Sequence, residues 1–400
     1  MSFRRQAAAG AGPWLTRLLR GRRSPDAGVR AIADPARVAR ILVLKPHDQL
    51  GDFLVATPAL AALRARYPNA RITLLTRAFL AGIARLQPDV DEVWVQPRVA
   101  GLADAVAFAG VVAEVARLRP DLAFVLNSVS RSRTADALAA LSGARLVVGR
   151  SWVGDGPLAA DAPGDPAAAA FAAMGRDGVY DLDLACAAAS EHQSRRVLDL
   201  VRWTGADADW RTLRLALDDR ARVAGFETIE SAWRVSAPID GPPSPAAARV
   251  RWIGIHPGAA NPLKCWPLER FVELGVALAR GGAADEDRRL IVFDSPRERG
   301  RATAVHAGLL AHGVRAAFVP PGAIAGFASA CAHLALLVCN DSGVMHIAAA
   351  LVVPTVSFHA LGRPVEWAPA HPRAAAFFAE RAIDTLAVEP ARVAAERLLA

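Results

Sequence analysis

Residues 340–346, with the sequence NDSGVMH, combine groups that could bind a phosphorylated ligand. An apolar run precedes them and a small-residue helical pattern follows, which predicts a strand that leads into a helix N-terminus. Ser342 or Asp341 could cap this helix, and Gly343 would let a ligand approach the backbone. The free amides of a first helical turn attract phosphates, and His346 would lie one turn further along the same side. The alternative is a capped helix with a core histidine and no ligand.

A second loop, residues 256–265 with the sequence HPGAANPLKC, also stands between a strand pattern and a helix pattern. Pro257 and Gly258 predict a sharp turn, and Lys264 places a cation near the start of the helix. Backbone amides and a lysine together suit a diphosphate, so the two loops predict one diphosphate site. The chain has no GxxxxGK[ST] motif and no GxGxxG after its first strand, which disfavours P-loop ATPases and dinucleotide oxidoreductases.

Asp52 follows Gly51 at the carboxyl end of the first expected strand. One interpretation is a helix N-cap with no chemical role. If its domain faces the phosphate site across a cleft, however, the carboxylate could act as general base for a hydroxyl nucleophile. Asp48 and His47 are second candidates for that base.

Metal binding is the other chemistry that paired aspartates suggest, because a DxD pair holds a metal with the diphosphate in some sugar transferases. None of the three pairs here directly follows a strand at a loop of the expected site. We therefore expect solvated turns and no metal site. The pairs are Asp89/Asp91, Asp181/Asp183 and Asp207/Asp209.

Charge is concentrated at the start of this 400-residue chain. Residues 1–40 hold nine arginines against two aspartates, a charge of +7 out of the +8 of the whole chain. Since the remainder is near neutral, a nucleic-acid partner is not expected, and the basic character belongs to an arm over residues 1–37. Trp14 and neighbouring leucines interleave with these arginines, so the arm could lie on an anionic membrane surface or be a solvated tail.

Lysine is rare in this chain: of 47 basic residues only Lys45 and Lys264 are lysines. A lysine retained in an arginine-rich chain can mark a place that needs a compact point charge, although chance survival is the alternative. The four cysteines show no CxxC spacing, which predicts neither a disulfide framework nor a zinc site and fits a reducing compartment. No secretory signal is apparent.

Strand and helix patterns alternate through most of the chain, which predicts an α/β fold with doubly wound parallel sheets. The alternation stops at a Pro-, Ser- and Ala-rich stretch and then restarts, so two domains are expected. Because ligands bind at the carboxyl ends of such strands, the loops above would lie at the functional edges. The expected parts are the arm 1–37, a first domain 38–235, a linker 236–249 and a second domain 250–400.

Three stretches resemble glycosyltransferase family 9, the ADP-heptose:lipopolysaccharide heptosyltransferases. They are residues 40–72, 254–274 and 340–358, in the order and spacing of that family, and the resemblance covers roughly residues 38–370. It implies the GT-B architecture, in which two Rossmann-like doubly wound domains face each other across a cleft. The donor would bind the C-terminal domain and the acceptor mainly the N-terminal one. It also implies an inverting reaction that needs no metal and no cofactor beyond the nucleotide-sugar donor.

The resemblance also implies roles for single residues. Asp52 would be the catalytic base, and Arg131 would contact the acidic acceptor. In the donor site Asp341 would bind the sugar and Glu298 the nucleoside. The residues implied around the donor phosphates are Ala259, Ala260, Lys264, Ser342, Gly343 and His346.

The expected activity is transfer of a heptose or related sugar from an ADP-sugar to a lipopolysaccharide core or similar glycan, and the resemblance implies ADP-heptose as the donor. We expect the protein in the cytoplasm, with the arm as a contact to the inner face of the membrane. Residues 293–295 and 359–363 depart from the family pattern, so donor and acceptor stay open. The alternatives are the same fold with another nucleotide sugar for a different surface glycan, or a non-catalytic nucleotide-sugar-binding paralogue.

Overall fold

The structure is a computed structural model, and it describes residues 31–45, 49–97, 101–127, 132–150, 180–184, 191–236, 249–296, 300–369 and 371–400. These residues form two compact units, which divide between Trp210 and Arg211. The arm up to residue 30, the loop 151–179 and the linker residues 237–248 lie outside the described residues.

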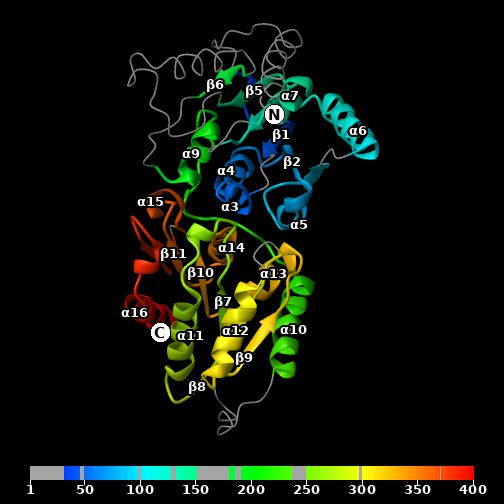
Figure 1. The fold of residues 1–400 in the computed structure, drawn as a ribbon. Helices are drawn as coiled ribbons and strands as arrows, with labels where there is room; N and C mark the ends of the chain where they lie inside the picture. Colours follow the sequence, from blue (N-terminus) through cyan, green and yellow to red (C-terminus); the bar gives the residue numbers. More distant parts are fainter. Residues whose placement is uncertain are drawn as a thin grey trace, which may run out of the picture. The chain divides into compact units, whose positions relative to one another are not determined.

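The first unit contains a six-stranded sheet in the order β3-β2-β1-β4-β5-β6, and every pair of neighbouring strands is parallel (Figure 1). This is the strand order of a Rossmann fold. Its strands are β1 Arg40–Lys45, β2 Arg71–Arg77, β3 Glu92–Gln96, β4 Leu122–Val125, β5 Leu146–Gly149 and β6 Leu182–Asp183. Its α-helices are α3 Leu50–Leu54, α4 Thr57–Arg66, α5 Ala81–Ala84, α6 Leu102–Leu118, α7 Arg133–Leu141 and α9 Gln193–Arg202, with a 3-10 turn over Ala78–Leu80.

The second unit repeats this arrangement, with a parallel six-stranded sheet in the order β12-β11-β10-β7-β8-β9. Two such sheets confirm the expected doubly wound α/β fold. The strands are β7 Arg249–His256, β8 Glu286–Phe293, β9 Ala316–Val319, β10 Leu336–Asn340, β11 Thr355–His359 and β12 Ala374–Phe378. The α-helices are α10 Asp219–Val235, α11 Leu268–Arg280, α12 Arg301–Ala311, α13 Ile324–Cys331, α14 Gly343–Ala350, α15 Pro364–Trp367 and α16 Val388–Leu399, with 3-10 turns over Pro262–Lys264 and Ile383–Thr385.

Each sheet has one switch point, where the chain has wound outward in both directions from two central strands. These strands are β1 and β4 in the first sheet and β7 and β10 in the second. The loops that leave the carboxyl ends of such a pair diverge and leave room for a ligand. The two loops that the sequence singled out in the second domain follow β7 and β10, so the fold brings them to one switch point.

Helix α10 belongs to the second unit, although the sequence placed it at the end of the first domain, which was expected to reach residue 235. It packs against α13 and β9 (Figure 1). Gly225 lies so close to α13 that a Cβ there would approach the backbone oxygen of Ser329 to 2.2 Å. This backbone contact explains why the compact units divide before α10 rather than after it.

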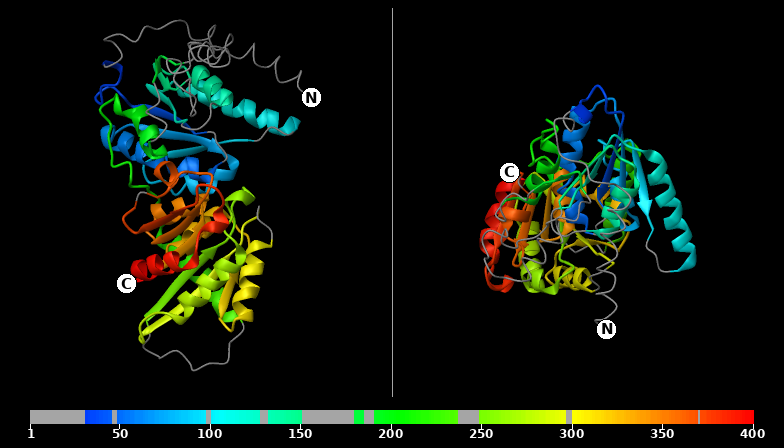
Figure 2. Two further views of the ribbon diagram at one scale, coloured as in Figure 1. Left: turned by 60° about the vertical axis from the view of Figure 1, so that its left-hand side comes forward. Right: turned by 90° about the horizontal axis from the view of Figure 1, so that it is seen from above.

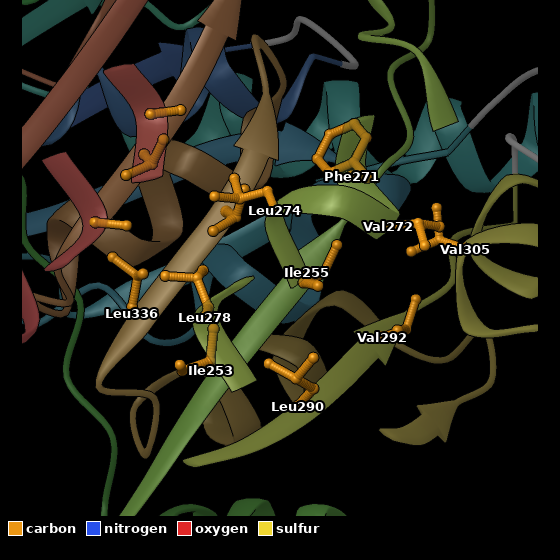
Figure 3. Close-up of a cluster of buried hydrophobic side chains, with 14 of the residues drawn as sticks. Ile253, Ile255, Phe271, Val272, Leu274, Leu278, Leu290, Val292, Val305 and Leu336 are labelled. Carbon is orange, nitrogen blue, oxygen red and sulfur yellow. The ribbon is translucent and has the colours of Figure 1, made fainter. Parts of the chain in front are cut away.

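The core of the second unit is a layer of aliphatic and aromatic side chains between the sheet and α11 (Figure 3). Helix α11 points Phe271, Leu274 and Leu278 inward, a spacing of three and four residues that forms one helical face. They meet alternate residues of β7, Ile253 and Ile255, which share one face of the strand. The buried layer therefore packs α11 against the strand that leads to the loop after β7.

The segment that follows β1 forms two short helices rather than one long helix. The chain forms α3 and then α4, because Pro58 stands in the first turn of α4 and cannot donate to a continuing helix. Helix α6 is apolar yet lies at the margin of its unit in both views of Figure 2, with Leu102 and Val106 exposed. Among the described residues no helix is long and apolar enough to cross a membrane.

Candidate functional site

The side chain of Asn340, the last residue of β10, joins the two loops of the second switch point. Its Oδ1 accepts a hydrogen bond from the amide of Trp266 at 2.9 Å, and its Nδ2 donates to the carbonyl of Pro257 at 2.8 Å. The Trp266 ring stacks on Phe358 of β11, with ring centroids 3.8 Å apart. One amide on β10 therefore holds both ends of the loop that follows β7.

Arg301, at the start of α12, stabilises the same loop from its other side. Its Nε donates to the carbonyl of Pro257 at 2.9 Å, and its Nη2 donates to the carbonyl of Trp266 at 2.8 Å. Sequence reasoning missed this residue, because nothing in the spacing of Arg301 ties it to a loop more than thirty residues earlier. The guanidinium fork can bind two carbonyls at once, which a lysine could not do with the same geometry.

The loop held in this way presents Lys264 to Asp341. Asn261 accepts a hydrogen bond from the amide of Leu263 at 3.0 Å and so opens the 3-10 turn that ends at Lys264. The Nζ of Lys264 lies 2.6 Å from Oδ2 of Asp341. The Asp341 side chain is 6% exposed and that of Lys264 is 28% exposed, so the ammonium is the more accessible partner. The structure thus brings together the cation and the carboxylate that the sequence placed on separate loops.

His359, at the end of β11, lies behind Asp341. Its Nδ1 is 3.9 Å from Oδ1 of Asp341, and its Nε2 is 2.9 Å from the hydroxyl oxygen of Ser357. The pKa of His359 is lowered to about 4, mainly by burial; the charge of Asp341 opposes this shift and that of Lys264 adds to it. His359 is therefore neutral at pH 7, and the contact with Asp341 is not an ion pair there.

Gly362 lies directly against the carboxylate of Asp341. A Cβ at this position would lie 2.5 Å from Oδ2 of Asp341, so any larger residue would displace the side chain that holds Lys264. Sequence reasoning missed Gly362 and His359 as site residues. The signal available was their place in residues 359–363, directly after the strand that neighbours β10.

Ser342 is the N-cap residue of α14 by backbone geometry, but no side chain caps this helix. Ser342 thus occupies the predicted N-cap position without a side-chain cap bond: Asp341 is bound to Lys264, and within the described part of the chain the Ser342 hydroxyl has no hydrogen-bond partner. The hydroxyl and the amides of the first turn, which begins at Gly343, can therefore bind a ligand. His346 is buried one turn further on.

The other expected residues of this site differ in what the structure shows. Ala259 is buried and Ala260 is exposed in the loop that leads to Lys264, as the sequence implied. Glu298, the expected nucleoside contact, lies outside the described residues, as do Arg131, His47 and Asp48 in the first domain. Their roles remain predictions.

Asp52 lies in the first turn of α3 in the first unit and is 2% exposed. The helix N-cap is Gln49, so the interpretation of Asp52 as an N-cap is wrong. Lys45, the last residue of β1, is also 2% exposed. Burial lowers the pKa of Lys45 from its ordinary value of 10.5 to about 8, and the charge of Asp52 acts in the opposite direction. Each lysine of the chain thus interacts electrostatically with an aspartate to which the sequence gave a role.

The DxD pairs are not all solvated turns as expected. Asp89 is buried, and Asp91 accepts hydrogen bonds from the backbone amide of Ile72 and from Arg64. Both aspartates therefore shape the turn before β3. Among the described residues no group of three or more His, Cys, Asp or Glu side chains is arranged to hold a metal ion.

Comparison with known proteins supports the family that the motifs indicated. A sequence model described as glycosyltransferase family 9 (heptosyltransferase) matches residues 191–388, about half of the chain. A putative glycosyltransferase of Haemophilus influenzae is 41% identical over 54 residues, which are 14% of this chain and 15% of that relative.

Solved structures share the fold at low sequence identity. A family 9 glycosyltransferase from Veillonella parvula matches with a TM-score of 0.70 and 20% identity, over 90% of this chain and 97% of its own. The E. coli ADP-heptose lps heptosyltransferase II matches with a TM-score of 0.66 and 19% identity, over 90% and 98% of the two chains. The E. coli heptosyltransferase WaaC with ADP gives a TM-score of 0.61 at 19% identity, over 90% and 99%. The two Rossmann-like units therefore have the GT-B fold, and with the family model match, the chain belongs to glycosyltransferase family 9.

Proposed function

We propose that this protein is an inverting glycosyltransferase that moves a heptose or a related sugar from an ADP-sugar to a lipopolysaccharide core or a similar glycan. The observation that carries the proposal is the pair formed by Lys264 Nζ and Asp341 Oδ2, 2.6 Å apart at the switch point of the second sheet. An ammonium suits a diphosphate and a carboxylate suits sugar hydroxyls, and both stand beside the amides of α14. The family match and the ADP-heptose named for a structural relative support the choice of donor.

The proposed reaction is a direct displacement at the anomeric carbon. Asp52 takes the proton from an acceptor hydroxyl while that oxygen forms a bond to the anomeric carbon. The bond from this carbon to the diphosphate oxygen breaks on the opposite face, which inverts the configuration. The negative charge then moves onto the diphosphate, where the ammonium of Lys264 and the first-turn amides from Gly343 stabilise it.

Lys264 Nζ contacts Asp341 Oδ2, so a donor whose diphosphate takes the ammonium exchanges the partner of each group. The diphosphate replaces the carboxylate as partner of the ammonium, and Asp341 turns its oxygens to the sugar. His359 is neutral at pH 7 and cannot replace the lost cation, so the released carboxylate needs the sugar hydroxyls as donors. This coupling favours a nucleoside diphosphate that carries a sugar over one that does not.

A screen of ADP-, UDP- and GDP-sugars, run in EDTA with transfer and binding both measured, tests the proposal. We expect the ADP-sugar to bind most tightly and to be turned over in the chelator, because Lys264 and the helix amides stabilise the leaving group without a metal. A preference for a UDP- or GDP-sugar would favour the same fold serving another glycan. Binding without transfer or hydrolysis of any donor would favour a non-catalytic paralogue, and loss of transfer that Mg²⁺ restores would overturn metal independence.

We also propose that the basic arm contacts the anionic inner face of the membrane, where a lipid-linked acceptor is found. Deleting residues 1–30 should abolish sedimentation with vesicles that contain anionic lipid and keep turnover on a water-soluble acceptor. The deletion stops at residue 30 because Ala33 is buried and its carbonyl accepts a hydrogen bond from the Tyr67 hydroxyl at 2.9 Å. Unchanged sedimentation of the shortened protein would refute the contact.

A further inference from the structure

Lys45 occupies the switch point of the first sheet. It is the last residue of β1, which lies between β2 and β4. From β1 the chain continues to β2 on one side and later forms β4 on the other, so this is the point where the order of the strands reverses. Its backbone carbonyl accepts a hydrogen bond from the Thr76 hydroxyl at 3.1 Å, which fixes the end of the strand. The place where ligands meet a doubly wound sheet is therefore occupied here by a cationic side chain that the proposed reaction has not yet used.

The buried position of Lys45 disfavours the charged form of its side chain. The side chain is among the largest that are fully buried, and the charge named as acting on it is that of Asp52, which is itself 2% exposed. A buried ammonium loses hydration, and this loss needs a compensating negative charge nearby. The chain uses arginine at 45 of its 47 basic positions, yet this one is a lysine. A compact, strongly charged group at this point has a role other than packing.

Among the described groups, the carboxylate of Asp52 is the one whose charge favours the protonated form of Lys45. Its charge acts on Lys45, and by reciprocity the ammonium favours the ionised form of the carboxylate. Burial by itself favours the neutral form of a carboxyl group, and Asp52 is 2% exposed. A general base must be ionised before it can take a proton, so the buried carboxylate needs a compensating charge nearby.

We propose that Lys45 is a positioning residue that acts through Asp52, keeping the carboxylate ionised and ready to accept the proton of the acceptor hydroxyl. The inference rests on the proposed role of Asp52 as base. Lys45 itself does not touch the reacting atoms; its ammonium stabilises the anion before proton transfer. After transfer, the same ammonium faces a neutral acid, which returns the proton to solvent and restores the pair.

A double-mutant cycle in the full-length protein tests this inference. The variants are Lys45→Met, Asp52→Asn and the two combined, with kcat, donor KM and thermal unfolding measured for each. We expect Lys45→Met to lower kcat on the order of tenfold or more with little change in donor KM, because the donor site lies in the other unit. In the Asp52→Asn background the same change should have no further effect, since there is no carboxylate left to ionise. Lys45→Arg should keep more of the turnover than Lys45→Met.

Arg40→Met is the matched control. It removes one positive charge from the exposed start of the same strand and should leave kcat unchanged. If Lys45→Met does not fold, Lys45→Gln replaces it in the same cycle, with unfolding and nucleotide binding as the criteria for a folded protein.

The outcomes separate the inference from the proposed function. Wild-type kcat in the Lys45 variant, or effects that multiply in the double variant, would overturn the inference while Asp52→Asn still lowers turnover. Wild-type turnover in Asp52→Asn alone would instead refute the role of Asp52 as general base, and with it the proposed mechanism.

Discussion

Replacing Asp52 with Asn is expected to lower kcat by about 10²–10⁴, the usual contribution of a positioned general base. The amide has the size of the carboxylate, so the first turn of α3 should keep its packing. It cannot accept a proton, however, and the acceptor hydroxyl must then lose its proton to water. Turnover of a saturating donor and acceptor, measured by release of the nucleoside diphosphate, gives the effect directly.

Donor affinity separates a chemical effect from a structural one. Because Lys264 and Asp341 belong to the second unit, Asp52→Asn should bind ADP with the wild-type dissociation constant. Asp104→Asn is a matched control, since Asp104 is the third residue of α6 as Asp52 is the third residue of α3. The control should keep its turnover. A wild-type kcat for Asp52→Asn would reject the base assignment.

Replacing Lys264 with Met should weaken binding of ADP roughly 10- to 100-fold, the range expected for loss of one charge-assisted hydrogen bond. Methionine keeps most of the apolar stem of lysine, so the turn that Asn261 opens can form as before. The Asp341 carboxylate, 6% exposed, loses its cation and then faces the diphosphate as an uncompensated like charge. Repulsion therefore adds to the lost attraction. Titration calorimetry measures both the affinity and the enthalpy.

Asp341, the ion-pair partner of Lys264, provides the control for this prediction. Asp341→Asn leaves the ammonium of Lys264 without its carboxylate, so ADP should bind at least as tightly as to the wild type, while the gain in affinity from the sugar should shrink. The two single variants are thus expected to move ADP affinity in opposite directions. Wild-type affinity in Lys264→Met would reject a phosphate contact for this lysine.

The alternation of apolar strands and helical patterns was sufficient to predict two doubly wound sheets, because each pattern is local and the parallel order follows from the connections. The same local pattern could not assign α10. Its sequence indicates a helix, but the contact that places it in the second unit depends on Gly225 meeting Ser329, more than one hundred residues later. The sequence therefore predicted the elements better than the boundary between the domains.

The candidate site shows the same division. Lys264 and Asp341 could be predicted because each follows a strand and precedes a helix, which fixes the edge of the sheet where it lies. The supporting residues could not be predicted in this way. Arg301 acts through two carbonyls of a distant loop, and Gly362 acts by having no Cβ beside Asp341. Such roles depend on close approach in space and leave no spacing pattern in the chain.

The amide of Asn340 has a thermodynamic consequence for donor binding. Its two hydrogen bonds hold the loop after β7 at Pro257 and at Trp266, and both are made within the protein. The conformational entropy of ordering that loop is therefore lost when the domain folds, and it is not lost again when a nucleotide sugar arrives. The site is preorganised: more of the energy of each phosphate contact remains available as affinity, and the rate of donor association is not limited by a search for the bound loop conformation.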